Sequence, residues 1–116
     1  MIKALVNNSW KLFDINELQP GTSVFNFETG LYETIRTRDH GPILLTYHLD
    51  RLFNSAKSTD LKPPFHRKEV ESMIMQVIES SPEPDQRVRV LLVPDKVIIY
   101  TMPLDLDYDI YNGVSV

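Results

Sequence analysis

The sequence predicts one α+β domain, with a mainly antiparallel sheet built from hairpins and two helices between the groups of strands. Three observations lead to this fold class. Strand-like segments occur in pairs around short turns, residues 31–37 alternate between two kinds of side chain, and two later segments repeat apolar residues at helical spacing. The length of 116 residues suits one domain with a core of its own.

The first hairpin is expected at the N-terminus. Residues 2–6 form a short apolar run, and the polar turn 7–9 separates it from its expected partner strand at 10–13. Residues 14–22 contain a Pro-Gly pair and predict a loop, whereas the pattern over 23–27 is ambiguous.

A strand with two different faces is predicted at 31–37. One face carries Tyr32, Thr34 and Arg36, and the other carries Leu31, Glu33, Ile35 and Thr37. A turn over 38–42 follows, and Ile43-Leu44 predict the start of a returning strand.

Two amphipathic helices come next. The first is expected to begin after Thr46 as its N-cap and to end near Ser58. Its apolar row contains Leu49, Leu52, Phe53 and Ala56. The second helix begins around Glu69 and stops at Ser80-Ser81-Pro82. Its apolar row contains Val70, Met73, Ile74, Val77 and Ile78.

Two strands at 87–93 and 97–102 complete the first domain, which we expect to span residues 1–103. The second strand is apolar on both faces, which predicts a central position in the sheet. Residues 104–109 carry three aspartates and predict an acidic linker. Residues 110–116 predict the first strand of a missing C-terminal domain; the alternative is a frayed tail or an added edge strand.

Composition excludes several classes of site. The chain has no cysteine, so it has no disulfide, thiolate nucleophile or Cys-ligated metal. Its net charge is −4 and no basic face is visible, which argues against nucleic acid as a partner. It shows neither a signal peptide nor an apolar run of the ~20 residues that span a membrane. We therefore expect a cytoplasmic protein.

Arg51 is the leading candidate for an anion site. On the helix it points away from the apolar row, and His48 and Ser55 share its flank at spacings of three and four residues. A guanidinium offers a planar fork of donors that matches phosphate oxygens. The alternative is a solvated helix face, because most arginines are exposed.

The strand face of Tyr32, Thr34 and Arg36 is the second candidate, since Arg36 can clamp a carboxylate and Tyr32 can donate a hydrogen bond. Arg87 and Arg89 form a similar pair on a later strand. For both sets of residues, the alternative is a strand face that is simply exposed to solvent. The three histidines lack the spacing of known metal ligands, so no metal site is predicted.

Two motifs resemble the N-terminal domain of class IV aminotransferases, the fold-type IV pyridoxal-phosphate enzymes. They are Gly30-Leu-Tyr-Glu-Thr-Ile-Arg36 and, after a turn and an apolar segment, His48-Leu-Asp-Arg-Leu52. The order continues with Arg-Val-Arg-Val-Leu-Leu-Val-Pro-Asp, so the resemblance runs from about Gly30 to the chain end. The family includes branched-chain and D-amino-acid aminotransferases and aminodeoxychorismate lyase.

The resemblance implies a role for each matching residue. Arg51 matches the arginine that holds the phosphate of pyridoxal 5′-phosphate. Tyr32 and Arg36 match strand positions that line the substrate pocket, and Thr34 lies between them on the same face. Glu33 points the other way as a structural residue. The resemblance further implies an amino acid and a 2-oxo acid as substrates and a homodimer. Neither nucleic acid nor a membrane is expected as a partner, because the chain shows no basic face and no long apolar run.

One departure from the family bears directly on catalysis. The family's cofactor-bonding lysine lies in the second domain, past the end of this chain, and no lysine here matches it. The resemblance therefore implies the small domain of an aminotransferase or aminodeoxychorismate lyase, with no catalytic residue of its own and inactive alone. The alternative is a stand-alone, non-catalytic domain that binds a small molecule or dimerises.

Overall fold

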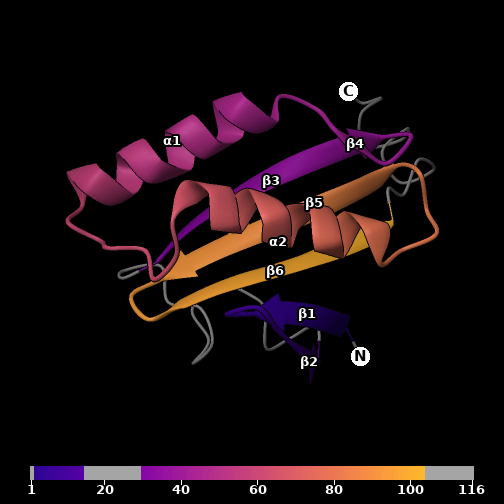
Figure 1. The fold of residues 1–116 in the computed structure, drawn as a ribbon, viewed down its shortest axis with the longest axis horizontal. Coiled ribbons are helices and arrows are strands. Elements are labelled where there is room, and N and C mark those ends of the chain that lie inside the picture. Colours follow the sequence, from indigo (N-terminus) through magenta and orange to yellow (C-terminus); the bar gives the residue numbers. More distant parts are fainter. Residues whose placement is uncertain (1, 15–29, 104–116) are drawn as a thin grey trace, which may run out of the picture.

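The computed structural model describes residues 2–14 and 30–103, and it confirms the α+β class (Figure 1). The antiparallel sheet has the strand order β2-β1-β6-β5-β3-β4. Its elements are β1 (Ile2–Val6), β2 (Ser9–Phe13), β3 (Leu31–Arg38), β4 (Gly41–Pro42), α1 (Leu45–Ser58), α2 (Arg67–Glu79), β5 (Gln86–Val93) and β6 (Lys96–Pro103). The predicted acidic linker, the strand at 110–116 and nearly all of the predicted loop lie outside the described residues.

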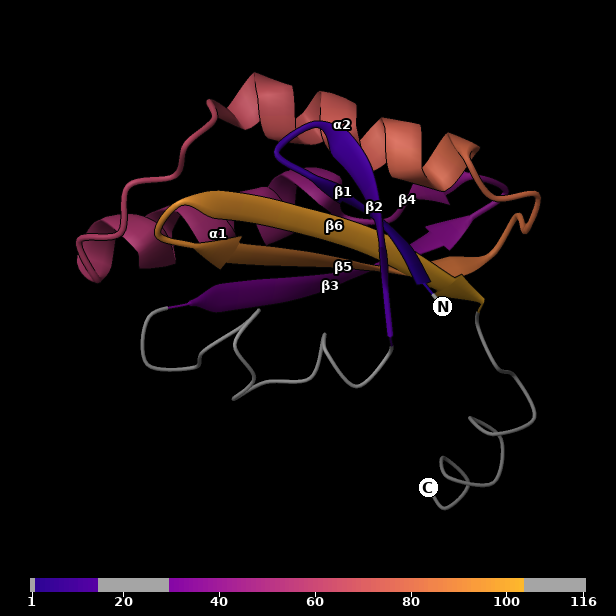
Figure 2. The same cartoon turned by 90° about the horizontal axis from the view of Figure 1, so that it is seen from below.

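Both helices cover the same face of the sheet (Figure 2). Helix α1 lies over β3, while α2 lies over β5, β6 and β1. The apolar rows that define the helices in the sequence meet the sheet here, which explains why these segments are helical at these places. The buried core includes Leu49, Leu52, Ala56, Val70, Ile74, Val77, Ile78, Ile35, Val90 and Ile99.

The predicted central position of β6 is confirmed. Val97, Ile98 and Ile99 are all fully buried, because β6 lies between β1 and β5 and both of its faces are covered. On the face away from the helices a second buried cluster contains Ala4, Val6, Leu91, Val93, Ile98 and Tyr100.

Strand β3 has the two faces that the alternation predicts. Glu33, Ile35 and Thr37 are buried on the helix side, whereas Tyr32 and Arg36 are exposed on the opposite side. The short strand β4 pairs only with the end of β3, at Thr37 and Arg38. The stretch of β3 before this pairing therefore has β5 as its strand partner and α1 packed on its helix side.

Two predictions about the start of α1 are wrong. The returning strand is Gly41–Pro42 and not Ile43-Leu44, because the chain already turns at 43–44 to enter the helix. The N-cap is Leu44 and not Thr46, since Leu44 adopts a left-handed backbone (φ 57°) and its carbonyl oxygen accepts a hydrogen bond from His48 N–H at 3.0 Å. No side chain caps this end of the helix.

Replacing Leu44 with asparagine is expected to raise the free energy of unfolding by about 1 kcal/mol. Asparagine tolerates the left-handed conformation and supplies a capping oxygen, while little packing is lost because Leu44 is 64% exposed. Urea denaturation of the two proteins checks this. The matched change Leu49→Asn, at a buried position of the same helix, should be strongly destabilising. An equal or lower stability of Leu44→Asn would contradict the capping account.

Candidate functional site

Arg51 extends outward from α1 with one side of its guanidinium held. Its Nε lies 3.5 Å from Glu33 Oε2 on β3, and the guanidinium carbon lies 5.7 Å from the centre of the Tyr47 ring. The side chain is still 57% exposed. The hydrogen bond with Tyr47 and then the charge of Glu33 raise the pKa of Arg51. Arg51 is therefore a fixed cation that an anion can reach.

His48 lies one turn before Arg51 and contacts the same carboxylate. Its Nδ1 is 2.7 Å from Glu33 Oε1. Because an ionised carboxylate only accepts hydrogen bonds, Nδ1 carries the proton in this pair. The ring of His48 also meets the Tyr47 ring edge to face, with centroids 5.6 Å apart. Glu33, Tyr47, His48 and Arg51 thus form one connected group between β3 and α1.

A hollow of about 580 Å³ opens beside this group. Its lining residues are Thr34, Arg36, Thr37, Arg38, Ile43, Leu44, His48 and Asp85. The volume is in the range of small-molecule sites. The structure thus brings two predicted pocket residues, Thr34 and Arg36, together with His48 from the helix. Arg51 and Tyr32 are not among the residues that line it.

Tyr32 lies instead beside Arg89, which the sequence offered only as half of a secondary pair. Arg89 is on β5, next to Thr34 in register, and its guanidinium carbon lies 5.8 Å from the centre of the Tyr32 ring. The Arg89 Nε is buried and has no hydrogen-bond partner among the described residues. Arg89 is thus partly buried, and a buried donor of this kind is suited to an anion.

Tyr100 on β6 completes this side of the sheet. It pairs in register with Arg89 and is 2% exposed. Burial raises the pKa of Tyr100, and the neighbouring charge and hydrogen bond of Arg89 partly offset that rise. Arg36 and Arg87 are also directly opposite each other in register. Like charges directly opposite each other repel, so this pairing by itself costs some stability.

Three residues at the site were not predicted as site residues from the sequence: Glu33, Tyr47 and Tyr100. Glu33 was expected to be structural, and it contacts both His48 and Arg51. Its signal was present, as a charged residue between Leu31 and Ile35 on the buried face of the strand. Tyr47 had the four-residue spacing to Arg51 that allows contact on a helix. Tyr100 gave no signal, since its place beside Arg89 depends on the register of β5 and β6.

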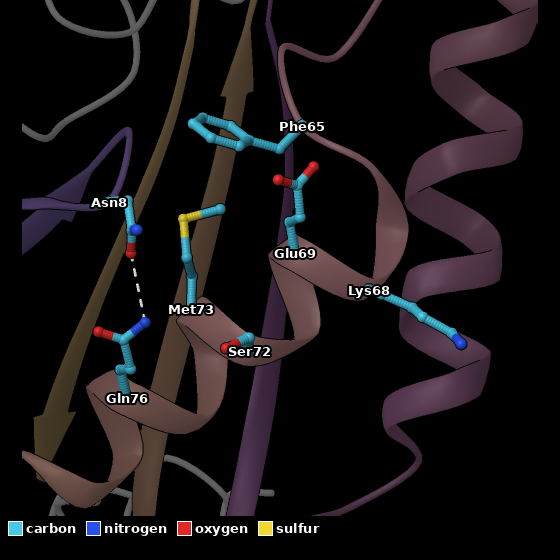
Figure 3. A pocket seen from close by; sticks show the side chains of 7 residues that line it. All are labelled: Asn8, Phe65, Lys68, Glu69, Ser72, Met73 and Gln76. Atoms are coloured by element: carbon cyan, nitrogen blue, oxygen red, sulfur yellow. Dashed lines mark hydrogen bonds between the residues drawn. The ribbon is translucent and has the colours of Figure 1, made fainter.

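A second hollow, of about 250 Å³, lies between α2 and the β1–β2 turn (Figure 3). Phe65 and Met73 form its apolar wall, and Gln76 Nε2 donates a hydrogen bond to Asn8 Oδ1 at 3.2 Å. The Glu69 carboxylate accepts a hydrogen bond from the His66 backbone N–H at 2.8 Å. None of the predicted site residues lines this hollow.

Among residues 2–14 and 30–103 no three His, Asp or Glu side chains form a group that could hold a metal ion. Neither described helix has the length and apolar character needed to cross a membrane.

Comparison with known proteins identifies the same fold. The sequence matches the family described as Amino-transferase class IV over residues 30–105. Branched-chain amino acid aminotransferase of Escherichia coli superimposes with a TM-score of 0.71 at 20% identity, over 89% of this chain and 40% of that one. The corresponding T.th. enzyme with pyridoxamine 5′-phosphate gives 0.68 at 20% identity, over 89% and 40%. No curated protein sequence matches significantly.

A putative 4-amino-4-deoxychorismate lyase from Legionella pneumophila is also similar, with a TM-score of 0.58 at 18% identity over 66% of this chain and 34% of that one. At these identities the structural matches establish the fold. The chain spans about 40% of the length of the aminotransferases that it superimposes on. Since the family match covers more than half of the residues, the chain belongs to the class IV aminotransferase family.

Proposed function

We propose that this chain is the N-terminal domain of a pyridoxal-phosphate-dependent aminotransferase, which moves an amino group between an amino acid and a 2-oxo acid. One observation carries the proposal. Arg51 is an exposed cation whose Nε faces Glu33, and Glu33 also binds His48, which lines a hollow together with Arg36 and Thr34. Residues 1–103 form this domain in our proposal, 104–109 link it to the next, and 110–116 begin that second domain.

The residues present fit the phosphate of the cofactor. Arg51 carries a positive charge at any physiological pH, and its exposed guanidinium has donors that match phosphate oxygens. Arg51 would hold the phosphate from this side. When bound, pyridoxal 5′-phosphate supplies the electron sink that amino-group chemistry requires.

The opposite side of β3 suits the substrate. Arg36 lines the hollow, and Arg89 offers a buried donor beside Tyr32 and Tyr100. An amino acid and a 2-oxo acid each carry a carboxylate. Guanidinium groups that are partly shielded from water bind carboxylates well. These residues would orient the substrate by that group, while Tyr32 limits the space beside it.

For aminotransferase chemistry, the lysine that bonds to the cofactor would have to come from outside these 116 residues. The chain's own lysines are Lys3, Lys11, Lys57, Lys62, Lys68 and Lys96, and none lines the hollow formed by Thr34, Arg36 and His48. We therefore propose that the 116-residue chain is inactive alone. Further parts of this proposal are a homodimer in the cytoplasm and a cofactor that lies between two domains.

Two other functions stay open. Aminodeoxychorismate lyase is the first, because one similar structure carries that description. A non-catalytic domain that binds a phosphorylated small molecule at Arg51 is the second. An assay of the purified full-length protein with a panel of amino donors and 2-oxo acids, beside one for pyruvate release from aminodeoxychorismate, separates the three. Amino transfer supports our proposal, pyruvate release alone favours the lyase, and neither activity favours the binding domain.

A further inference from the structure

Glu33 is a charged residue at a buried position where an apolar side chain would be expected. It is 9% exposed on the helix-facing side of β3. Ile35 is buried on the same face, and the register partner of Glu33 on β5 is the buried Val90. Removing a carboxylate from water costs stability, and ion pairs in such sites are often no more stabilising than an apolar side chain of similar size. Packing therefore does not explain this residue.

The two oxygens of Glu33 serve different donors on α1. Oε1 accepts the short hydrogen bond from His48 Nδ1 at 2.7 Å, and Oε2 faces Arg51 Nε at 3.5 Å. His48, whose side chain is 18% exposed, thus anchors the carboxylate, and the anchored carboxylate faces Arg51.

A guanidinium is planar, so an acceptor at Nε fixes the orientation of the whole group. Nε faces Glu33 and the guanidinium also makes a hydrogen bond with Tyr47, so the donors that these two residues do not engage remain for another anion. The Tyr47 ring, at 5.7 Å, limits movement of the group further. Binding is tighter when the donors are already oriented, because less side-chain freedom is lost.

We propose that Glu33 is a positioning residue, which with His48 orients Arg51 for binding a phosphate group. This inference rests on the proposed role of Arg51. A purely structural role, in which Glu33 only ties α1 to β3, makes a different prediction. Removing a structural ion pair lowers stability, whereas removing a positioning group changes Arg51 and leaves the fold intact or more stable.

Two variants of the 116-residue chain separate these roles. Glu33→Leu places an apolar side chain in the apolar site, and Glu33→Gln keeps the shape without the charge. Glu71→Gln is the matched control, because Glu71 Oε2 also lies 3.5 Å from an arginine Nε, that of Arg67 on α2. Three quantities are measured: the urea midpoint, the NMR signal of Arg51 Nε–H, identified by its absence in Arg51→Lys, and the affinity for inorganic phosphate.

The proposal predicts that in both Glu33 variants the Arg51 Nε–H signal shifts and its hydrogen exchanges faster. Phosphate affinity should fall roughly fivefold, the effect of one net hydrogen bond. Glu33→Leu should keep or raise the urea midpoint, and Glu71→Gln should leave the Arg51 signal and phosphate affinity unchanged.

An unchanged Arg51 Nε–H signal in Glu33→Gln overturns the proposal, as does phosphate affinity equal to that of the wild type. If Glu33→Leu does not fold, Glu33→Gln still decides between these outcomes. Failure of the wild-type chain to bind phosphate at Arg51 would contradict the proposed function, and the Nε–H signal would still show whether Glu33 orients the guanidinium.

Discussion

Replacing Arg51 with alanine in the full-length protein is expected to weaken pyridoxal 5′-phosphate binding roughly 10- to 100-fold. The change removes a cation whose donors are open to solvent and whose inner side is held by Glu33. The fold should be unaffected, because the side chain contributes little to the core. Equilibrium titration of the cofactor, followed by its absorbance, measures the effect.

The matched control for Arg51→Ala is Lys57→Ala, which removes an exposed positive charge from the last turn of the same helix. Lys57→Ala should leave cofactor affinity unchanged, which would show that the loss at position 51 is local. Equal affinity of Arg51→Ala and the wild type would remove Arg51 from the phosphate site.

Replacing Arg89 with methionine is expected to lower kcat/KM for amino transfer roughly 10- to 100-fold, mainly by raising KM. The change removes the donor that we assign to the substrate carboxylate. Stability should fall slightly, because the change also removes the Arg89 hydrogen bond to the buried Tyr100, although the buried Nε of Arg89 has no partner among the described residues. Steady-state kinetics and urea denaturation give the two quantities.

The same variant has a spectroscopic readout. Arg89 lowers the pKa of Tyr100, which burial raises, so the Tyr100 pKa should move still higher in Arg89→Met. Ultraviolet titration of the tyrosines detects this shift. Arg67→Met is the control, since Arg67 bonds Asp50 and Glu71 on the helix side, and it should leave KM unchanged. Unchanged KM in Arg89→Met would exclude Arg89 from the substrate site.

The sequence predicted the features of the fold that depend on local periodicity. The alternation over 31–37 separated the buried face of β3 from the exposed one, and the apolar rows located both helices. It failed at the start of α1, because the left-handed backbone at Leu44 follows from the tight connection to β4 and not from the preference of leucine. A polar residue such as Thr46 was the better cap by propensity alone.

The candidate site was predictable only in part, for a related reason. Spacing on one helix identified the outward position of Arg51 and its neighbour His48. The contacts of Glu33 with both of them cross from a strand to a helix, and no local pattern encodes that distance. Arg89 looked like an exposed strand residue, and only the register with Tyr100 and Thr34 shows its partly buried position.

The central claim is that this chain serves a pyridoxal-phosphate enzyme whose covalent attachment point lies outside it. The most direct test reduces the native protein from its source with borohydride and determines the intact mass and the modified peptide. Our account predicts a protein larger than 13.4 kDa that carries a pyridoxyl group on a lysine absent from these 116 residues. An unmodified protein, or a pyridoxyl group on one of the lysines of this chain, would contradict it.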